Sequence, residues 1–157
     1  MKIEDLTQKL VHSRLLQNEE QVQAFEQSIE SIISMKTSDC IKKLYLGFDD
    51  STENDEIMFG LLHTIESFDQ ELGLEQSLIK LAEALRYMLP HAKEWAKIFH
   101  KRILNQEETR NAYATVISYA DNATRDLVIS LVNEIKIKNP EKFAKKTEEF
   151  LLSIKSL

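Results

Sequence analysis

The stretch FDDSTENDEIMFGLLHTIESFDQE, from Phe48 to Glu71, joins an acidic opening to a helical apolar pattern. It contains eight carboxylates, one histidine and no lysine or arginine. Its apolar residues recur at spacings of three and four, which is typical of an amphipathic helix. The stretch therefore predicts an acidic loop at residues 49–54 and a helix from about Asp55 to Phe68.

The predicted helix has two different faces when its residues are placed at about 100° per residue. The core face holds Ile57, Met58, Leu61, Leu62, Ile65 and Phe68. The opposite face holds Glu56, Phe59, His63 and Glu66. Phe59 is unusual there, because an exposed phenylalanine lowers solubility. Either it packs on a neighbouring helix, or it is an aromatic anchor ringed by polar groups, as in many protein interfaces.

Helical apolar spacing continues along most of the chain, and turn-forming residues are few. There are three glycines and two prolines in 157 residues, fewer than an all-β fold needs for its turns. The prediction is an all-α fold: one domain, residues 1–157, of about nine helices. The helices are expected to form stacked antiparallel pairs, like a solenoid, or a compact bundle.

Local signals mark where several of these helices begin and end. Asn18 with Gln21, and Asn105 with Glu108, have the spacing of capping boxes. Pro90 is predicted to terminate the helix that precedes it, because proline cannot continue a helix. These signals divide the chain into helices that start every fifteen to twenty residues or so.

The negative charge of the chain lies mostly in its first half. The net charge is −6, and residues 44–79 contain nine acids and no base. Such acidity repels phosphates and argues against nucleic-acid binding by this half, whereas it would speed encounter with a basic protein. No run approaches the roughly eighteen apolar residues of a membrane helix, so we expect a soluble cytoplasmic protein.

The sequence offers little for metal or cofactor chemistry. The single cysteine, Cys40, excludes an internal disulfide and a multi-cysteine zinc site. The acidic loop lacks the glycine and the final glutamate of a calcium loop. His63-x-x-Glu66 has the spacing of one helical turn but occurs once and in the reverse order of di-metal bundles. We therefore expect that the chain binds no metal and no cofactor. His63 and Glu66 are expected to be two solvated residues on one helix face.

One arrangement leaves an enzymatic alternative open. Arg86 and His91 have the Arg-x4-His spacing used by an all-helical ribonuclease superfamily, the HEPN domains. Tyr87 follows the arginine, where that superfamily usually has a polar residue, and Pro90 interrupts the helix between the two. Chance is the better explanation, so the chain is expected not to be an enzyme. A generic helical scaffold is the third possibility.

Two blocks of the sequence, DDSTENDEIMFGLLHTIESFD and LPHAKEWAKIFHKRILN, carry a family resemblance. Together they resemble immunity protein family thirty, an all-helical family of bacterial polymorphic-toxin immunity proteins, over residues of roughly 44 to 120. The matching residues are Asp49, Asp50, Glu56, Met58, Leu61, His63, Glu66, Trp95 and Arg102–Asn105. The resemblance implies an antitoxin that neutralises a secreted toxin by direct binding. It does not identify the toxin.

These considerations together predict a partner-binding surface. Its expected residues are Asp49, Asp50, Glu53, Glu56, Phe59, His63, Glu66 and Arg102. The acids before the helix would also stabilise its N-terminus, by about 0.3–1 kcal/mol each. Arg102 has an alternative role as a salt bridge to a neighbouring helix. The expected partner is a basic protein toxin, and a nuclease is one candidate.

Overall fold

The computed structural model describes residues 2–37 and 39–155. Over these ranges the chain forms ten α-helices and one 3-10 helix, and no strand, so the all-α prediction is confirmed. The elements are α1 Ile3–Ser13, α2 Glu19–Ser34, α3 Asp39–Leu44, η1 Tyr45–Gly47, α4 Asp55–Glu66, α5 Asp69–Leu72, α6 Leu74–Met88, α7 Lys93–Leu104, α8 Glu107–Ser118, α9 Asn122–Lys138 and α10 Pro140–Ser153. No helix in the described ranges combines the length and apolarity that crossing a membrane requires.

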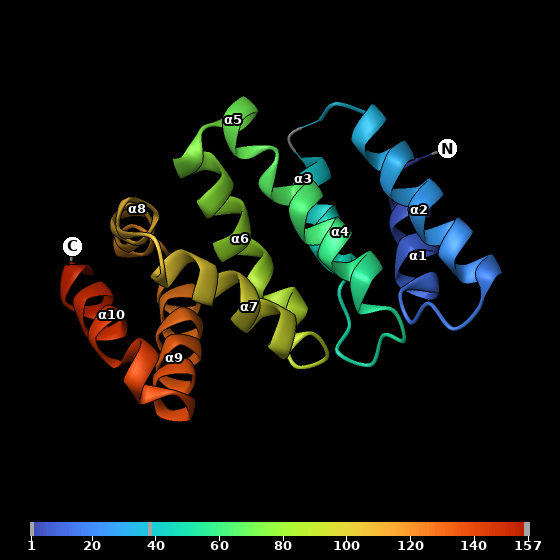
Figure 1. Ribbon diagram of the computed structural model, residues 1–157. Coiled ribbons are helices and arrows are strands. Elements are labelled where there is room, and N and C mark those ends of the chain that lie inside the picture. Colours follow the sequence, from blue (N-terminus) through green and yellow to red (C-terminus); the bar gives the residue numbers. More distant parts are fainter. Residues whose placement is uncertain (1, 38, 156–157) are drawn as a thin grey trace.

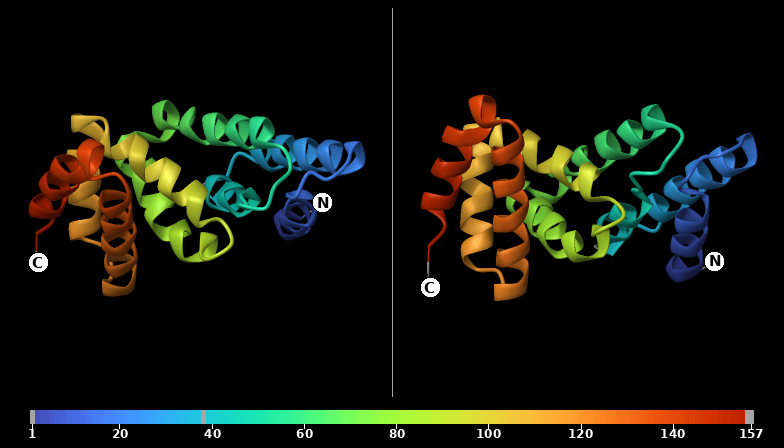
Figure 2. Two further views of the ribbon diagram at one scale, coloured as in Figure 1. Left: turned by 60° about the horizontal axis from the view of Figure 1, so that its bottom comes forward. Right: turned by 90° about the horizontal axis from the view of Figure 1, so that it is seen from below.

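The helices follow one another along an elongated molecule, with the two termini at opposite ends (Figures 1 and 2). α1 packs against α2 at one end, and α9 packs against α10 at the other. Between them, α6 contacts α3, η1, α5, α7, α8 and α9. One hydrophobic core runs through all of these elements, from Leu6 to Phe150. The helices therefore run from one end of the molecule to the other broadly in sequence order, and α6 contacts elements of both halves.

Most of the predicted helix ends are confirmed, and one is wrong. The Asn18 side chain accepts a hydrogen bond from the Gln21 backbone amide at 2.9 Å, and α6 ends before Pro90. Asn105, however, does not cap α8, which begins at Glu107 after Gln106 without a side-chain cap. The Asn105 side chain instead accepts a hydrogen bond from Lys146 of α10 at 2.8 Å. Asn105 therefore contacts α10, which is distant in the sequence, rather than capping the neighbouring helix α8.

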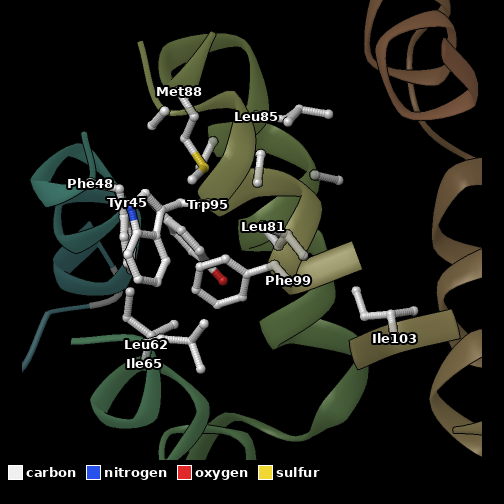
Figure 3. Close-up of a cluster of buried hydrophobic side chains, with 14 of the residues drawn as sticks. Tyr45, Phe48, Leu62, Ile65, Leu81, Leu85, Met88, Trp95, Phe99 and Ile103 are labelled. Carbon is white, nitrogen blue, oxygen red and sulfur yellow. The ribbon is translucent and has the colours of Figure 1, made fainter. Parts of the chain in front are cut away.

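An aromatic cluster fills the core between η1, α4, α6 and α7 (Figure 3). Tyr45 and Phe99 meet edge to face with ring centroids 5.2 Å apart, and Phe48 contacts Phe99 at 5.3 Å. Phe48 also lies 5.6 Å from Trp95. Aromatic pairs in these geometries stabilise a core by about 0.5–1.5 kcal/mol beyond the area that they bury. The cluster thus joins the first half of the chain to α7.

His100 of α7 is buried in the core and is neutral. Its Nδ1 lies 2.7 Å from the Ala96 carbonyl oxygen and its Nε2 lies 2.8 Å from the Tyr113 hydroxyl. Because a carbonyl only accepts, Nδ1 carries the proton and Nε2 accepts from Tyr113. Burial lowers the pKa of His100 from 6.5 to about 4.

Acidification should therefore destabilise the protein through His100. The pKa of His100 is lower in the folded state than in the unfolded state. Its contribution to stability is therefore fully present above pH 6.5 and is lost as the pH falls from 6.5 toward 4. Between pH 7 and pH 5 this group should reduce the free energy of unfolding by about 2 kcal/mol. Urea denaturation at each pH measures the change. The variant His100→Phe should show a correspondingly weaker pH dependence, and an equal slope in both proteins would contradict the assignment.

Candidate functional site

The acidic loop before α4 connects α1, α4 and α7. The Asp50 carboxylate accepts hydrogen bonds from the backbone amides of Glu94 at 3.0 Å and Trp95 at 3.3 Å. Its own amide donates to the His91 carbonyl oxygen at 2.8 Å. α7 begins after Ala92, which has no side-chain cap to offer. Asp50 therefore satisfies the free N–H groups of α7 from a position far away in the sequence.

Asp49 is turned toward the protein interior. It is only 9% exposed, and its carboxylate accepts a hydrogen bond from Arg14 Nε at 3.1 Å and one from the Ser51 amide at 2.8 Å. The Glu53 amide adds a bond to the Leu15 carbonyl oxygen at 2.8 Å. Both aspartates predicted to meet a partner thus already have partners within the fold. Their direct contact with another protein stays a prediction.

The buried face and the exposed face of α4 consist of nearly the same residues as predicted. Met58, Leu61, Leu62 and Ile65 are buried, whereas Ile57 and Phe68 are half-buried. Glu56, Phe59 and His63 are exposed, and Glu66 is half-buried. Phe59 is 40% exposed and packs edge to face on Trp95, with ring centroids 4.9 Å apart. Phe59 therefore combines the two alternatives: one part packs on α7 and the rest faces solvent.

Glu66 and Arg102 form an ion pair between α4 and α7. Arg102 donates through Nε at 2.7 Å and through Nη2 at 2.8 Å to the two carboxylate oxygens. These hydrogen bonds raise the pKa of Arg102 above its usual value. His63 Nδ1 lies 3.7 Å from the same carboxylate. The salt-bridge role anticipated for Arg102 is thus present.

The two sequence blocks that carry the family resemblance lie against each other. Asp50 holds the start of α7, Phe59 packs on Trp95, and Glu66 pairs with Arg102. These contacts join the loop and α4 to α7 at successive positions along both helices. Several of the motif residues are therefore those that hold α4 in place and determine which of its side chains face solvent.

A groove between α2 and α4 extends the acidic surface. α2 contributes Glu26, Ile29, Glu30 and Ile33, and α4 contributes Glu56, Ile57, Gly60, Leu61 and Thr64. Sequence reasoning about α4 alone missed Glu26 and Glu30. Their four-residue spacing on α2 was a usable signal, because such residues share one helix face. We call this surface the α2–α4 groove; Phe59 is not among the residues that line it.

The residues of the ribonuclease alternative face different parts of the chain. Arg86 donates to the Thr124 hydroxyl at 2.6 Å and pairs with Asp121 at the start of α9. His91 is bound through its carbonyl oxygen to Asp50, and burial together with the charge of Arg14 lowers its pKa. In residues 2–37 and 39–155, no cluster of three acidic, histidine or cysteine side chains is arranged to hold a metal ion.

Comparison with known proteins identifies one family. The family model described as Immunity protein 30 matches residues 12–113. The match extends the resemblance toward the N-terminus, and it includes Arg14, α2 and all the contacts between α4 and α7. No curated protein and no solved structure matches the chain significantly.

Removal of the Asp50 carboxylate should destabilise the fold. Asp50→Ala leaves two N–H groups at the start of α7 without their acceptor, and the free energy of unfolding should fall by about 1–2 kcal/mol. Urea denaturation measures this change. Ser51→Ala is the matched control, because Ser51 is an exposed neighbour in the same loop. Equal stability of the two variants would rule out the capping role.

Proposed function

The chain belongs to the Immunity protein 30 family, and on that premise we propose that it binds a cognate bacterial toxin and neutralises it by direct contact. Binding requires a surface that the fold itself does not use. The α2–α4 groove offers such a surface. Binding through the α2–α4 groove needs no catalytic group. The chain would inhibit the toxin by binding tightly and specifically to part of its surface.

The unpaired acidity of the groove supports this proposal most strongly. Glu26, Glu30 and Glu56 are exposed, and none of them has a cation within ion-pair distance in the described parts of the chain. Asp49 and Glu66, by contrast, each pair with an arginine. Free carboxylates of one sign attract a basic surface and accelerate its encounter.

Apolar groups accompany these charges. Ile29, Ile33 and Ile57 are partly buried in the same groove. Phe59, which also belongs to α4, presents a partly exposed ring where it packs on Trp95. An aromatic side chain flanked by polar groups is typical of interface hot spots. The proposed epitope therefore has an apolar centre and an acidic rim.

The charge of the groove also favours one class of toxin. A nuclease binds phosphates through a basic surface. An acidic immunity protein can cover that surface and exclude the substrate, because it presents charges of the same sign as the phosphates. We therefore propose a basic toxin domain, and a nuclease in particular.

The experiment uses the cognate toxin domain and measures association by stopped flow. The association rate should fall steeply as salt rises, since exposed charges are screened beyond about 8 Å at physiological ionic strength. The double variant Glu30→Lys and Glu56→Lys should slow association at least about tenfold. The control is Glu141→Lys with Glu148→Lys, an equal charge change on exposed positions of α10. Equal rates in both double variants would place the epitope elsewhere.

Phe59→Ala should act mainly on dissociation. If Phe59 is an anchor, its loss should weaken toxin binding by about 2 kcal/mol, with little change in the association rate. Tyr119→Ala provides the control, because Tyr119 is a more exposed aromatic at the end of α8. A thermal melt of each variant separates binding from stability. A large drop in melting temperature without faster dissociation would make Phe59 a purely structural residue.

A further inference from the structure

A second concavity has both members of the Glu66–Arg102 ion pair in its lining. It is a cavity of about 300 Å³ lined by residues of α3, η1, α4, α5, α6, α7 and α8. Leu78, Leu81 and Phe99 form part of an apolar wall. Tyr45, Asp69 and Ser77 bring polar groups to the same space. None of these polar groups takes part in the α2–α4 groove.

Ser77 and Tyr45 bring hydroxyl groups to this cavity, and the Ser77 hydroxyl makes no hydrogen bond of regular geometry within the described residues. Ser77 is only 9% exposed, and its hydroxyl oxygen is buried without a hydrogen bond among the described residues. Tyr45 is 4% exposed, and its hydroxyl makes no side-chain hydrogen bond in the described parts of the chain. Buried hydroxyls are usually paired, because leaving a hydrogen bond unmade in the interior destabilises the fold.

Asp69 adds a partly desolvated carboxylate. Burial raises the pKa of Asp69, the nearby charge of Glu66 raises it further, and the Ser77 hydroxyl lowers it in part. The Ser77 oxygen nevertheless makes no hydrogen bond of regular geometry. Burial, together with the charges of Asp69 and Glu66, raises the pKa of Tyr45, so its phenol stays neutral. A carboxylate and two hydroxyls therefore share one partly enclosed space.

The chemistry of these groups selects the ligand. Asp69 and Glu66 outweigh the single charge of Arg102, so an anion would be repelled. An apolar ligand would leave both hydroxyls unpaired. A lysine ammonium has three donors on a flexible apolar stem, and the stem can lie along Leu78 and Phe99 while the ammonium reaches the three oxygen-bearing side chains.

We propose that this cavity receives a lysine side chain of the partner protein, with its ammonium bound by Asp69, Tyr45 and Ser77. The inference rests on the proposed function, since the lysine would belong to the toxin. It adds a second contact site to the α2–α4 groove. The Glu66–Arg102 ion pair, which joins α4 to α7, forms part of the wall of this second site.

Nuclear magnetic resonance titration tests the cavity without the toxin. The probe is N-acetyl-lysine N-methylamide, and the neutral control is N-acetyl-norleucine N-methylamide. The lysine probe should shift the backbone amides of Tyr45, Asp69 and Ser77 with saturation, at a dissociation constant on the order of 1 mM. Absence of saturation, or equal shifts with the neutral compound, would overturn the proposal. Tighter binding of putrescine would assign the cavity to a free amine and would also overturn it.

The variant Asp69→Asn keeps the shape of the cavity and removes its charge. It should weaken binding of the lysine probe about tenfold. Its melting temperature should not fall, because the charged carboxylate is partly desolvated in the folded state. Asp55→Asn is the matched control, since Asp55 is exposed at the start of α4 and lies outside the cavity. Equal probe binding by the two variants would contradict the assignment.

The toxin complex separates this inference from the proposed function. Asp69→Asn should dissociate faster from the toxin than Asp55→Asn does. If Asp69→Asn dissociates from the toxin at the same rate as the wild-type protein, the lysine site is overturned, but the proposed immunity function is not affected. If the unaltered protein binds no toxin, the proposed function fails, and so does the assignment of the lysine to a toxin.

Discussion

The hydrogen bonds from the start of α7 to the Asp50 carboxylate are the contact on which the middle of the molecule depends. A helix N-terminus has N–H groups without intrahelical acceptors, and Ala92 cannot supply one. The loop that carries Asp50 is itself tied to α1 by Arg14 and Leu15. One short acidic segment thus fixes the position of α7 relative to the N-terminal helices, and Phe59 can then pack on Trp95.

The carboxylates of this protein fall into two groups with different consequences. Asp49, Asp50 and Glu66 are used by the fold, each through hydrogen bonds to an arginine or to backbone amides. Glu30 and Glu56 have no such partner in residues 2–37 and 39–155, and they lie at the groove between α2 and α4. Acids of the first group stabilise the packing of the helices, whereas those of the second group are exposed.

The cavity beside α6 contains polar groups that, unlike Asp49, Asp50 and Glu66, contribute little to the stability of the fold. In the described parts of the chain, the buried Ser77 hydroxyl makes no hydrogen bond of regular geometry, and Asp69 is a partly buried carboxyl group whose pKa is raised by that burial. Such features destabilise a fold, and they are common where a protein binds something. α6 can tolerate this cost because it contacts six other elements and has many apolar neighbours.

The sequence by itself determined the helices and many of their ends. Apolar spacing, the cap at Asn18 and the stop before Pro90 are local features, so a single segment contains all the information that they need. Only the tertiary structure decided that Asp50 caps a helix more than forty residues away and that α2 brings Glu30 beside α4. Helical periodicity shows which face is buried, but it does not show which helix will cover it. The roles of the acidic residues therefore became distinct only when the helices were packed together.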